Sequence, residues 1–84
     1  MIQSNVNPHD NYGPELEALL RAHSNVDNIA ADADLVDDLG LDSVAMIGFI
    51  IDVEEKFGVV IGGREIEDNV LKTVSTLLHF IRSN

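Results

Sequence analysis

Three stretches of the chain carry apolar residues at the three- to four-residue spacing of an amphipathic helix. The spacing predicts helices over residues 14–23 and 43–57, and a last helix that starts after Thr73. Thr73 can cap that last helix, and Gly58 is the kind of residue that ends a helix. A shorter helix is expected near residues 65–71. The chain is therefore predicted to be all-α, a bundle of three longer helices and one short helix.

The segments between the predicted helices lack a sustained period. Residues 24–41 combine acidic side chains with scattered aliphatic ones, which predicts a long loop that its aliphatic residues pin to the core. The apolar run "VVIGG" at 59–63 has no second strand to pair with, so it is predicted to be a buried loop segment. Residues 1–12 are polar, which predicts a flexible tail before a single folded domain over residues 13–84.

The predicted helix over 43–57 has two apolar faces when its residues are placed at about 100° per residue. The wider face is expected to contact the core and consists of Met46, Phe49, Ile50, Val53 and Phe57. The smaller face lies beside Ser43 and consists of Val44, Ile47 and Ile51, flanked by Gly48 and Glu55. So short a chain has few elements left to cover this second face. Its three apolar residues and the two that flank them are therefore predicted to bind a partner protein.

Ser43 stands where the long loop meets this helix, and it is open to three interpretations. Either Asp42 or Ser43 can cap the helix by accepting free backbone N–H groups. A nucleophilic role is disfavoured because activation needs a neighbouring base, and none of the three histidines lies in a motif with Ser43. The third interpretation is that another enzyme modifies the exposed hydroxyl, which needs no base within this chain.

The composition limits the partners that such a surface can have. The chain has 84 residues, a formal net charge of −10 and no cysteine. The negative charge disfavours nucleic acid and anionic membranes, and it favours a basic protein surface. The lack of cysteine excludes disulfides and fits a reducing cytoplasm. A cytoplasmic location is expected because no signal-peptide pattern and no membrane-spanning apolar run occur.

The acidic stretch "DADLVDDLG" invites comparison with a calcium-binding loop. The pattern fails, because Asp37 stands where such a loop needs glycine and Val36 replaces a ligand. A solvated acidic loop is therefore expected, with no metal site.

The segment "DDLGLDSVAMIGFIIDVEEKFGV" resembles the signature region of acyl and peptidyl carrier proteins, and "LKTVSTLLHFI" is similar to the closing segment of that family. The resemblance implies a four-helix acyl-carrier-type bundle that is not itself an enzyme. It implies that a phosphopantetheinyl transferase moves 4′-phosphopantetheine from coenzyme A onto Ser43, with Asp42 helping to position the transferase. The thiol of that arm would receive an acyl or aminoacyl group from a loading enzyme. Downstream acyltransferases, synthases or condensation enzymes would then receive the group.

Two departures from the family pattern concern the predicted partner face. Ala45 and Gly48 occupy positions where fatty-acid-type carriers often have acidic residues. A less acidic partner face favours a carrier of polyketide, nonribosomal peptide or related biosynthesis. Because the chain contains only the carrier domain, it is expected to be a discrete protein, and a monomer is expected. The alternatives are a fatty-acid-type carrier and an unmodified acidic interaction module. If carriers of this kind shelter their cargo between helices, the residues expected to line that space are Met46, Phe49, Ile50 and Val53.

Overall fold

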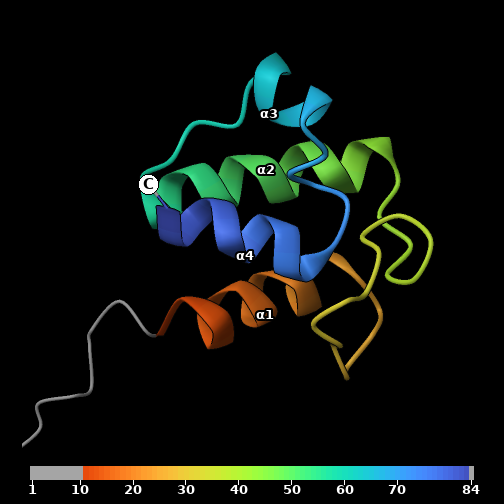
Figure 1. The fold of residues 1–84 in the computed structure, drawn as a ribbon. Coiled ribbons are helices and arrows are strands. Elements are labelled where there is room, and N and C mark those ends of the chain that lie inside the picture. The colour runs from red at the N-terminus through yellow and green to blue at the C-terminus, as the bar shows by residue number, and fades with distance from the viewer. Residues whose placement is uncertain (1–10, 84) are drawn as a thin grey trace, which may run out of the picture.

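Four helices make up the computed structural model, which describes residues 11–83 (Figure 1). They are α1 (Tyr12–His23), α2 (Ser43–Phe57), α3 (Gly63–Glu67) and α4 (Val74–Ser83). α1 packs against both α2 and α4, and the short α3 lies on the side of α2 away from α1. Within the described residues there is no strand, only an isolated bridge between Asp34 and Thr73. The predicted all-α fold of three longer helices and one short helix is confirmed.

Each longer helix contributes residues at helical spacing to one shared core. The helical residues that are buried there are Leu16 and Leu20 of α1, Phe49 and Val53 of α2, and Val74, Leu77 and Ile81 of α4. The predicted core face of α2 is confirmed, with its other three members partly buried against the same cluster. The apolar spacing of the sequence therefore identifies the inward side of every longer helix.

The connecting segments supply almost half of the buried apolar residues. Six of the thirteen in residues 11–83 lie outside the helices, namely Ala33, Leu35, Leu39, Leu41, Val59 and Ile61. The long loop is thus held to the core by its aliphatic side chains, as predicted. The segment after α2 is buried as predicted at two positions, while Val60 between them is 75% exposed.

The long loop is joined to the start of α4 by backbone hydrogen bonds. The N–H of Leu35 donates to the carbonyl of Lys72, and the N–H of Val74 donates to the carbonyl of Ala33, both at 3.0 Å. These bonds bring together segments that lie nearly forty positions apart in the sequence. The loop therefore has a defined path, and its exit towards α2 is fixed.

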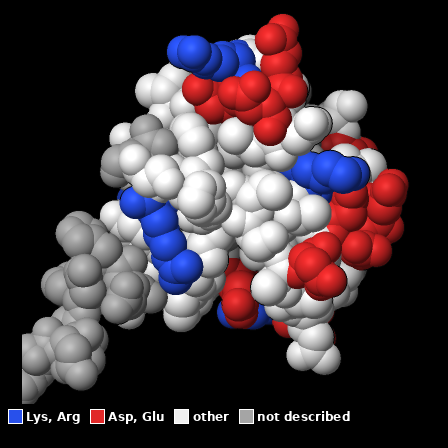
Figure 2. Space-filling view, in the orientation of Figure 1, with Lys and Arg blue, Asp and Glu red and all other residues white. Residues whose placement is uncertain are grey.

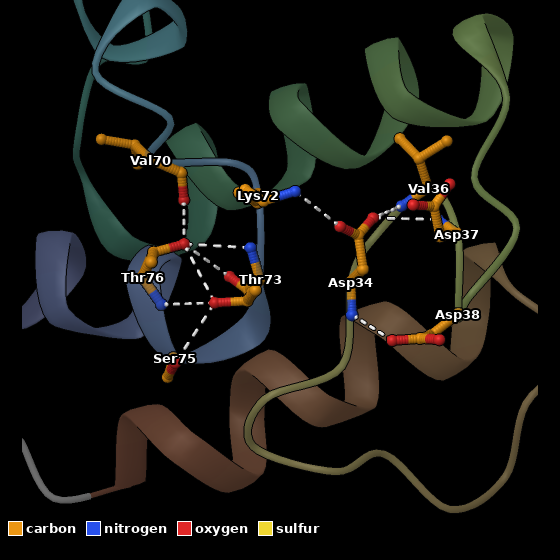
Figure 3. A network of polar contacts seen from close by, with 9 residues as sticks. All are labelled: Asp34, Val36, Asp37, Asp38, Val70, Lys72, Thr73, Ser75 and Thr76. Atoms are coloured by element: carbon orange, nitrogen blue, oxygen red, sulfur yellow. Dashed lines mark hydrogen bonds and ion pairs between the residues drawn. The ribbon is translucent and has the colours of Figure 1, made fainter.

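Asp34 organises this junction through its carboxylate (Figure 3). One oxygen accepts the N–H groups of Val36 and Asp37 at 2.9 Å, and the other accepts a hydrogen bond from Lys72 Nζ at 3.1 Å. The N–H of Asp34 itself donates to Asp38 Oδ2 at 2.7 Å. The hydrogen bond from the Asp37 N–H, followed by that from Lys72, lowers the pKa of Asp34. The loop carboxylates at positions 34 and 38 thus bind the loop's own backbone.

α4 begins as its sequence predicts. Thr73 Oγ1 accepts the N–H of Thr76 at 3.2 Å, and Thr76 Oγ1 accepts the N–H of Thr73 at 3.0 Å (Figure 3). This reciprocal pair satisfies two backbone donors, one at the cap and one in the first turn of α4. The predicted cap at Thr73 is confirmed.

Two helix boundaries differ from the prediction. α1 begins at Tyr12 rather than at Pro14, so Pro14 lies within the first turn of the helix. Proline is tolerated there because the backbone N–H that it lacks would have no acceptor within the helix. Tyr12 packs its ring edge-on against Phe57, with centroids 5.3 Å apart, so it belongs to the fold. Residues 1–10 of the predicted tail lie outside the described residues.

The short helix is earlier and shorter than predicted. It spans Gly63–Glu67 instead of 65–71, since Glu65 Oε1 accepts the N–H of Gly62 at 2.7 Å and starts the helix there. The chain then turns at Asn69, whose φ of 61° lies in the left-handed region. No residue of α3 is buried, so this helix is held less firmly than the other three.

Asp34→Asn is expected to lower the midpoint of thermal unfolding at neutral pH, because the ion pair with Lys72 is lost. A carboxyl whose pKa is lowered by folding stabilises the fold above its unfolded pKa, and that stabilisation disappears as pH falls through the folded pKa. The gap between variant and wild type should therefore close as the pH falls through the acidic range.

Asp37→Asn is the matched control, since the Asp37 carboxylate is exposed and makes no hydrogen bond within residues 11–83. Thermal unfolding followed by circular dichroism over a pH series measures both variants. A gap for Asp34→Asn that stays constant down to strongly acidic pH would contradict the assignment.

Candidate functional site

The start of α2 is capped by Asp42, and this decides between two of the interpretations of Ser43. Asp42 has extended backbone geometry, and its Oδ1 accepts the N–H of Ala45 at 2.8 Å. Its carbonyl accepts the N–H of Met46, also at 2.8 Å. Of the two candidates, Asp42 is therefore the cap, and Ser43 is the first residue inside the helix.

The loop delivers Ser43 to this position through its last two residues. Gly40 has a φ of 73°, which a residue with a side chain rarely adopts, and it turns the chain towards α2. Leu41 follows with 2% exposure, and its N–H donates to the carbonyl of Leu35 at 3.0 Å. A buried leucine thus anchors the chain two residues before the exposed serine.

The hydroxyl of Ser43 is available for chemistry. Ser43 is exposed, and within residues 11–83 its side chain makes no hydrogen bond. The N–H groups of Ser43 and Val44 belong to the first turn of α2, where backbone donors have no partner inside the helix. The hydroxyl therefore sits at the positive end of a fifteen-residue helix dipole, a setting that favours an attached anionic group.

An apolar ridge follows Ser43 along α2. We use the term docking ridge for Val44, Ile47 and Ile51, whose side chains are 79%, 60% and 48% exposed. The three positions are one turn apart and share one side of the helix. The smaller apolar face inferred from the sequence is thus present and uncovered by any part of the described chain.

The two residues expected to flank the ridge differ in their surroundings. Glu55 is exposed one turn beyond Ile51. Gly48 is only partly exposed, because the imidazole of His23 at the end of α1 lies over it. A Cβ on Gly48 would come within 3.3 Å of His23 Cε1, so this glycine permits a close approach of α1 to α2.

The four residues considered for sheltering a cargo fall into two groups. Met46 and Ile50 line a cavity of about 440 Å³, together with Ile66 and Leu71 from the segment around α3. Phe49 and Val53 have no exposed surface and belong to the packed core. Asp34 and Lys72 also line the cavity, so it combines apolar walls with charged groups.

Carboxylates surround the start of α2. Figure 2 shows acidic side chains gathered at the end of the molecule formed by the long loop and the beginning of α2. Residues 22–55 contain nine Asp and Glu and no Lys or Arg. The sequence did not reveal that Asp52, one of the nine, bonds to His23 of α1, since the two lie 29 positions apart. No local pattern connects them.

Two further observations concern metals and membranes. Within residues 11–83, no three His, Cys, Asp or Glu side chains gather closely enough to hold a metal ion. None of the helices in that range is both long enough and apolar enough to cross a bilayer.

Comparison with known proteins assigns the class. A family model described as "Phosphopantetheine attachment site" matches residues 15–81. Because the match covers most of the chain, the protein belongs to the family of phosphopantetheine-binding carriers. This family match confirms the predicted cofactor, 4′-phosphopantetheine. The family is non-catalytic, which also confirms that the chain is not an enzyme.

Curated relatives of the chain are named acyl carrier proteins. An acyl carrier protein of Mycolicibacterium paratuberculosis, MbtL, is 41% identical over 61 residues, which are 70% of this chain and 68% of the relative. An acyl carrier protein of Renibacterium salmoninarum is 38% identical over 55 residues, which are 66% of this chain and 65% of the relative. The matched segments thus span about two thirds of each relative. A carrier of this family implies a phosphopantetheinyl transferase and loading enzymes as partners.

Ile47→Glu and Ile51→Glu are expected to leave the free energy of unfolding within about 0.5 kcal/mol of the wild-type value, because both side chains are exposed. Phe49→Ala, two positions after Ile47, should cost about 3–5 kcal/mol, since it empties a fully buried site. Urea denaturation measures all three. Unfolding of either glutamate variant would mean that the ridge is part of the core.

Proposed function

We propose that Ser43 carries 4′-phosphopantetheine and that the chain holds biosynthetic intermediates as thioesters on this arm. The observation that carries the proposal is the division of roles at the start of α2, where Asp42 caps the helix and the exposed Ser43 hydroxyl has no hydrogen bond within residues 11–83. A hydroxyl without a structural partner can be modified without loss of a contact that the fold needs.

The surroundings of Ser43 suit an attached phosphodiester. The N–H groups of the first turn and the dipole of α2 offset part of its negative charge. The arm supplies a thiol, which a chain without cysteine lacks. Asp42 is exposed beside Ser43, where its carboxylate is accessible to the metal and basic groups of a transferase while one oxygen caps the helix.

Delivery to partner enzymes is proposed to use the docking ridge. The ridge begins at Val44, immediately after the modified serine, so an enzyme that contacts it is brought close to the tethered cargo. Gly48 and Glu55 would lie at its border. The complementary partner surface is an apolar groove flanked by Arg and Lys, because the carrier's own charge at this end is negative.

The cavity beside α2 is proposed as the shelter for the cargo. Met46 and Ile50 face it within two turns of Ser43, so an arm that folds back along α2 can place its acyl end there. Phe49 and Val53 would support this wall from the core side, because both are fully buried on the same helix.

We assign the chain to specialised metabolism, as a carrier for polyketide, nonribosomal peptide or related biosynthesis. In this assignment the carrier domain begins with α1 at Tyr12 rather than at residue 13, and loading, transfer and condensation enzymes are its partners. The exposed apolar ridge, with Ala45 and Gly48 in place of acidic residues, supports it. A fatty-acid synthase transacylase tests the choice, because efficient loading by that enzyme would favour a fatty-acid role.

Incubation with coenzyme A and a promiscuous phosphopantetheinyl transferase should add one phosphopantetheine group to the wild-type chain, read by intact mass. Ser43→Ala should gain nothing, while Ser75→Ala, which removes another exposed serine from a helix start, should be modified normally. A folded wild-type sample without the mass gain would rule out the carrier function. That outcome would leave an acidic interaction module.

Ile47→Glu and Ile51→Glu should slow modification of Ser43 and delivery to partner enzymes by about tenfold or more, because a buried charge at an apolar contact is costly. Val60→Glu is the control, since Val60 is an apolar residue beyond the other end of α2 and is more exposed, at 75%, than either isoleucine. Initial rates at subsaturating carrier concentration provide the comparison. Equal rates for all three variants would exclude the ridge from docking.

A further inference from the structure

The cavity beside α2 has a lining of two kinds. Apolar side chains from α2 and from the segment around α3 make up much of it, namely Met46, Ile50, Ile66 and Leu71. Polar side chains of the long loop and of the segment after α3 complete it, namely Asp34, Asp37, Asn69 and Lys72. A cargo that fills this cavity therefore meets hydrocarbon and polar groups together.

We propose that the cavity favours a hydroxyacyl cargo, whose hydroxyl accepts a hydrogen bond from Lys72 and donates one to Asp37. The hydrocarbon part of the acyl group would lie against the apolar lining. This inference rests on the proposed carrier function and on the cavity as the shelter, and it names the class of cargo that the shelter holds best.

Lys72 has donors to spare on the cavity wall. Its ammonium carries three N–H donors. One donates to Asp34 Oδ2 at 3.1 Å, and within residues 11–83 no other side chain accepts from this ammonium. The hydrogen bond with Asp34, and in smaller part the charge of Asp37, raise the pKa of Lys72, so the ammonium stays charged. Asp34 thus holds in place a cation with two unused donors.

The carboxylate of Asp37 is an unused acceptor close to that cation. It is exposed and makes no hydrogen bond within residues 11–83, since the bond to Asp34 comes from the backbone N–H of Asp37. Figure 3 shows the Asp34 carboxylate between Lys72 and Asp37. The wall therefore offers a donor and an acceptor together, and a hydroxyl is the small neutral group that can bond to both.

Other classes of cargo fit this wall less well. A plain hydrocarbon chain would take water from Lys72 and Asp37 without replacing its hydrogen bonds, which costs free energy. A carboxylate would meet two carboxylates and one ammonium, because Asp34 and Asp37 outnumber Lys72. Like charges brought together also cost free energy. The lining therefore favours a neutral group that both donates and accepts.

The test uses the full chain loaded with eight-carbon acyl groups. A promiscuous phosphopantetheinyl transferase moves the acyl-phosphopantetheine of an acyl-coenzyme A onto Ser43 Oγ, with release of adenosine 3′,5′-bisphosphate. The acyl groups are octanoyl, hydroxyoctanoyl with the hydroxyl on the third, fifth or seventh carbon, and the dicarboxylic suberyl group. Circular dichroism measures the midpoint of thermal unfolding of each form.

A cargo that binds only the folded state raises this midpoint. At least one hydroxyoctanoyl form should unfold about 2–4 °C above both the octanoyl and the suberyl forms. The shift is modest because Lys72 is 62% exposed, so water competes for its donors.

Variants identify the residues that produce the shift. Lys72→Met and Asp37→Ala should each reduce it, whereas Lys72→Arg, which keeps charge and donors, should retain it. Comparing acyl forms of one variant removes the cost of losing the ion pair with Asp34. Lys56→Met and Asp27→Ala are the controls, since both residues are exposed and lie outside the cavity lining. Asp37→Ala keeps the test decisive if Lys72→Met does not fold.

The two hypotheses fail in different ways. If the acyl groups are attached and no hydroxyoctanoyl form unfolds above both other forms, the inference is overturned while the carrier function stands. A shift that persists unchanged in either folded cavity variant, Lys72→Met or Asp37→Ala, overturns it as well. If the folded wild type accepts no acyl-phosphopantetheine, both the carrier function and this inference are overturned.

Discussion

The junction between the long loop and the start of α4 is the constraint on which the rest of the site depends. Two backbone hydrogen bonds, the carboxylate of Asp34 and the ammonium of Lys72 hold it together. The nineteen residues from Ser24 to Asp42 have no helix of their own, so their conformational entropy opposes any defined path. Attaching the middle of this segment to α4 leaves only a short stretch before Ser43. The position of the serine is thus determined by contacts made well away from it.

The start of α2 shows why two adjacent polar residues are needed there. A helix needs an acceptor for its first N–H groups. A residue that is to be modified needs a side chain whose hydroxyl makes no hydrogen bond that the fold requires. One residue cannot meet both demands, because a hydroxyl that caps a helix points back at the backbone. Asp42 meets the first and leaves Ser43 exposed. The same separation appears on α2 as a whole, where Phe49 stabilises the fold and Ile47 remains uncovered.

The elements that sequence reasoning predicted well are those with a strong local pattern. The period of apolar residues gave the inward face of α2, and the threonine before α4 gave its cap. Local reasoning was weaker where a residue has two allowed roles. Pro14 can begin a helix or stand within its first turn, and the contact of Tyr12 with Phe57 decides for the second. Local sequence patterns could not predict the contact between His23 and Asp52, because only the packing of α1 on α2 brings these two residues together.

The close approach of His23 to Gly48 links the evolution of two distant positions. An alanine at position 48 requires the imidazole to move by a few tenths of an ångström, and the bond to Asp52 and the ring of Phe49 resist that movement. A smaller residue at position 23 removes the obstacle. The substitutions that each position accepts therefore depend on the residue at the other. In a library of double variants, this dependence would appear as epistasis between the end of α1 and the middle of α2.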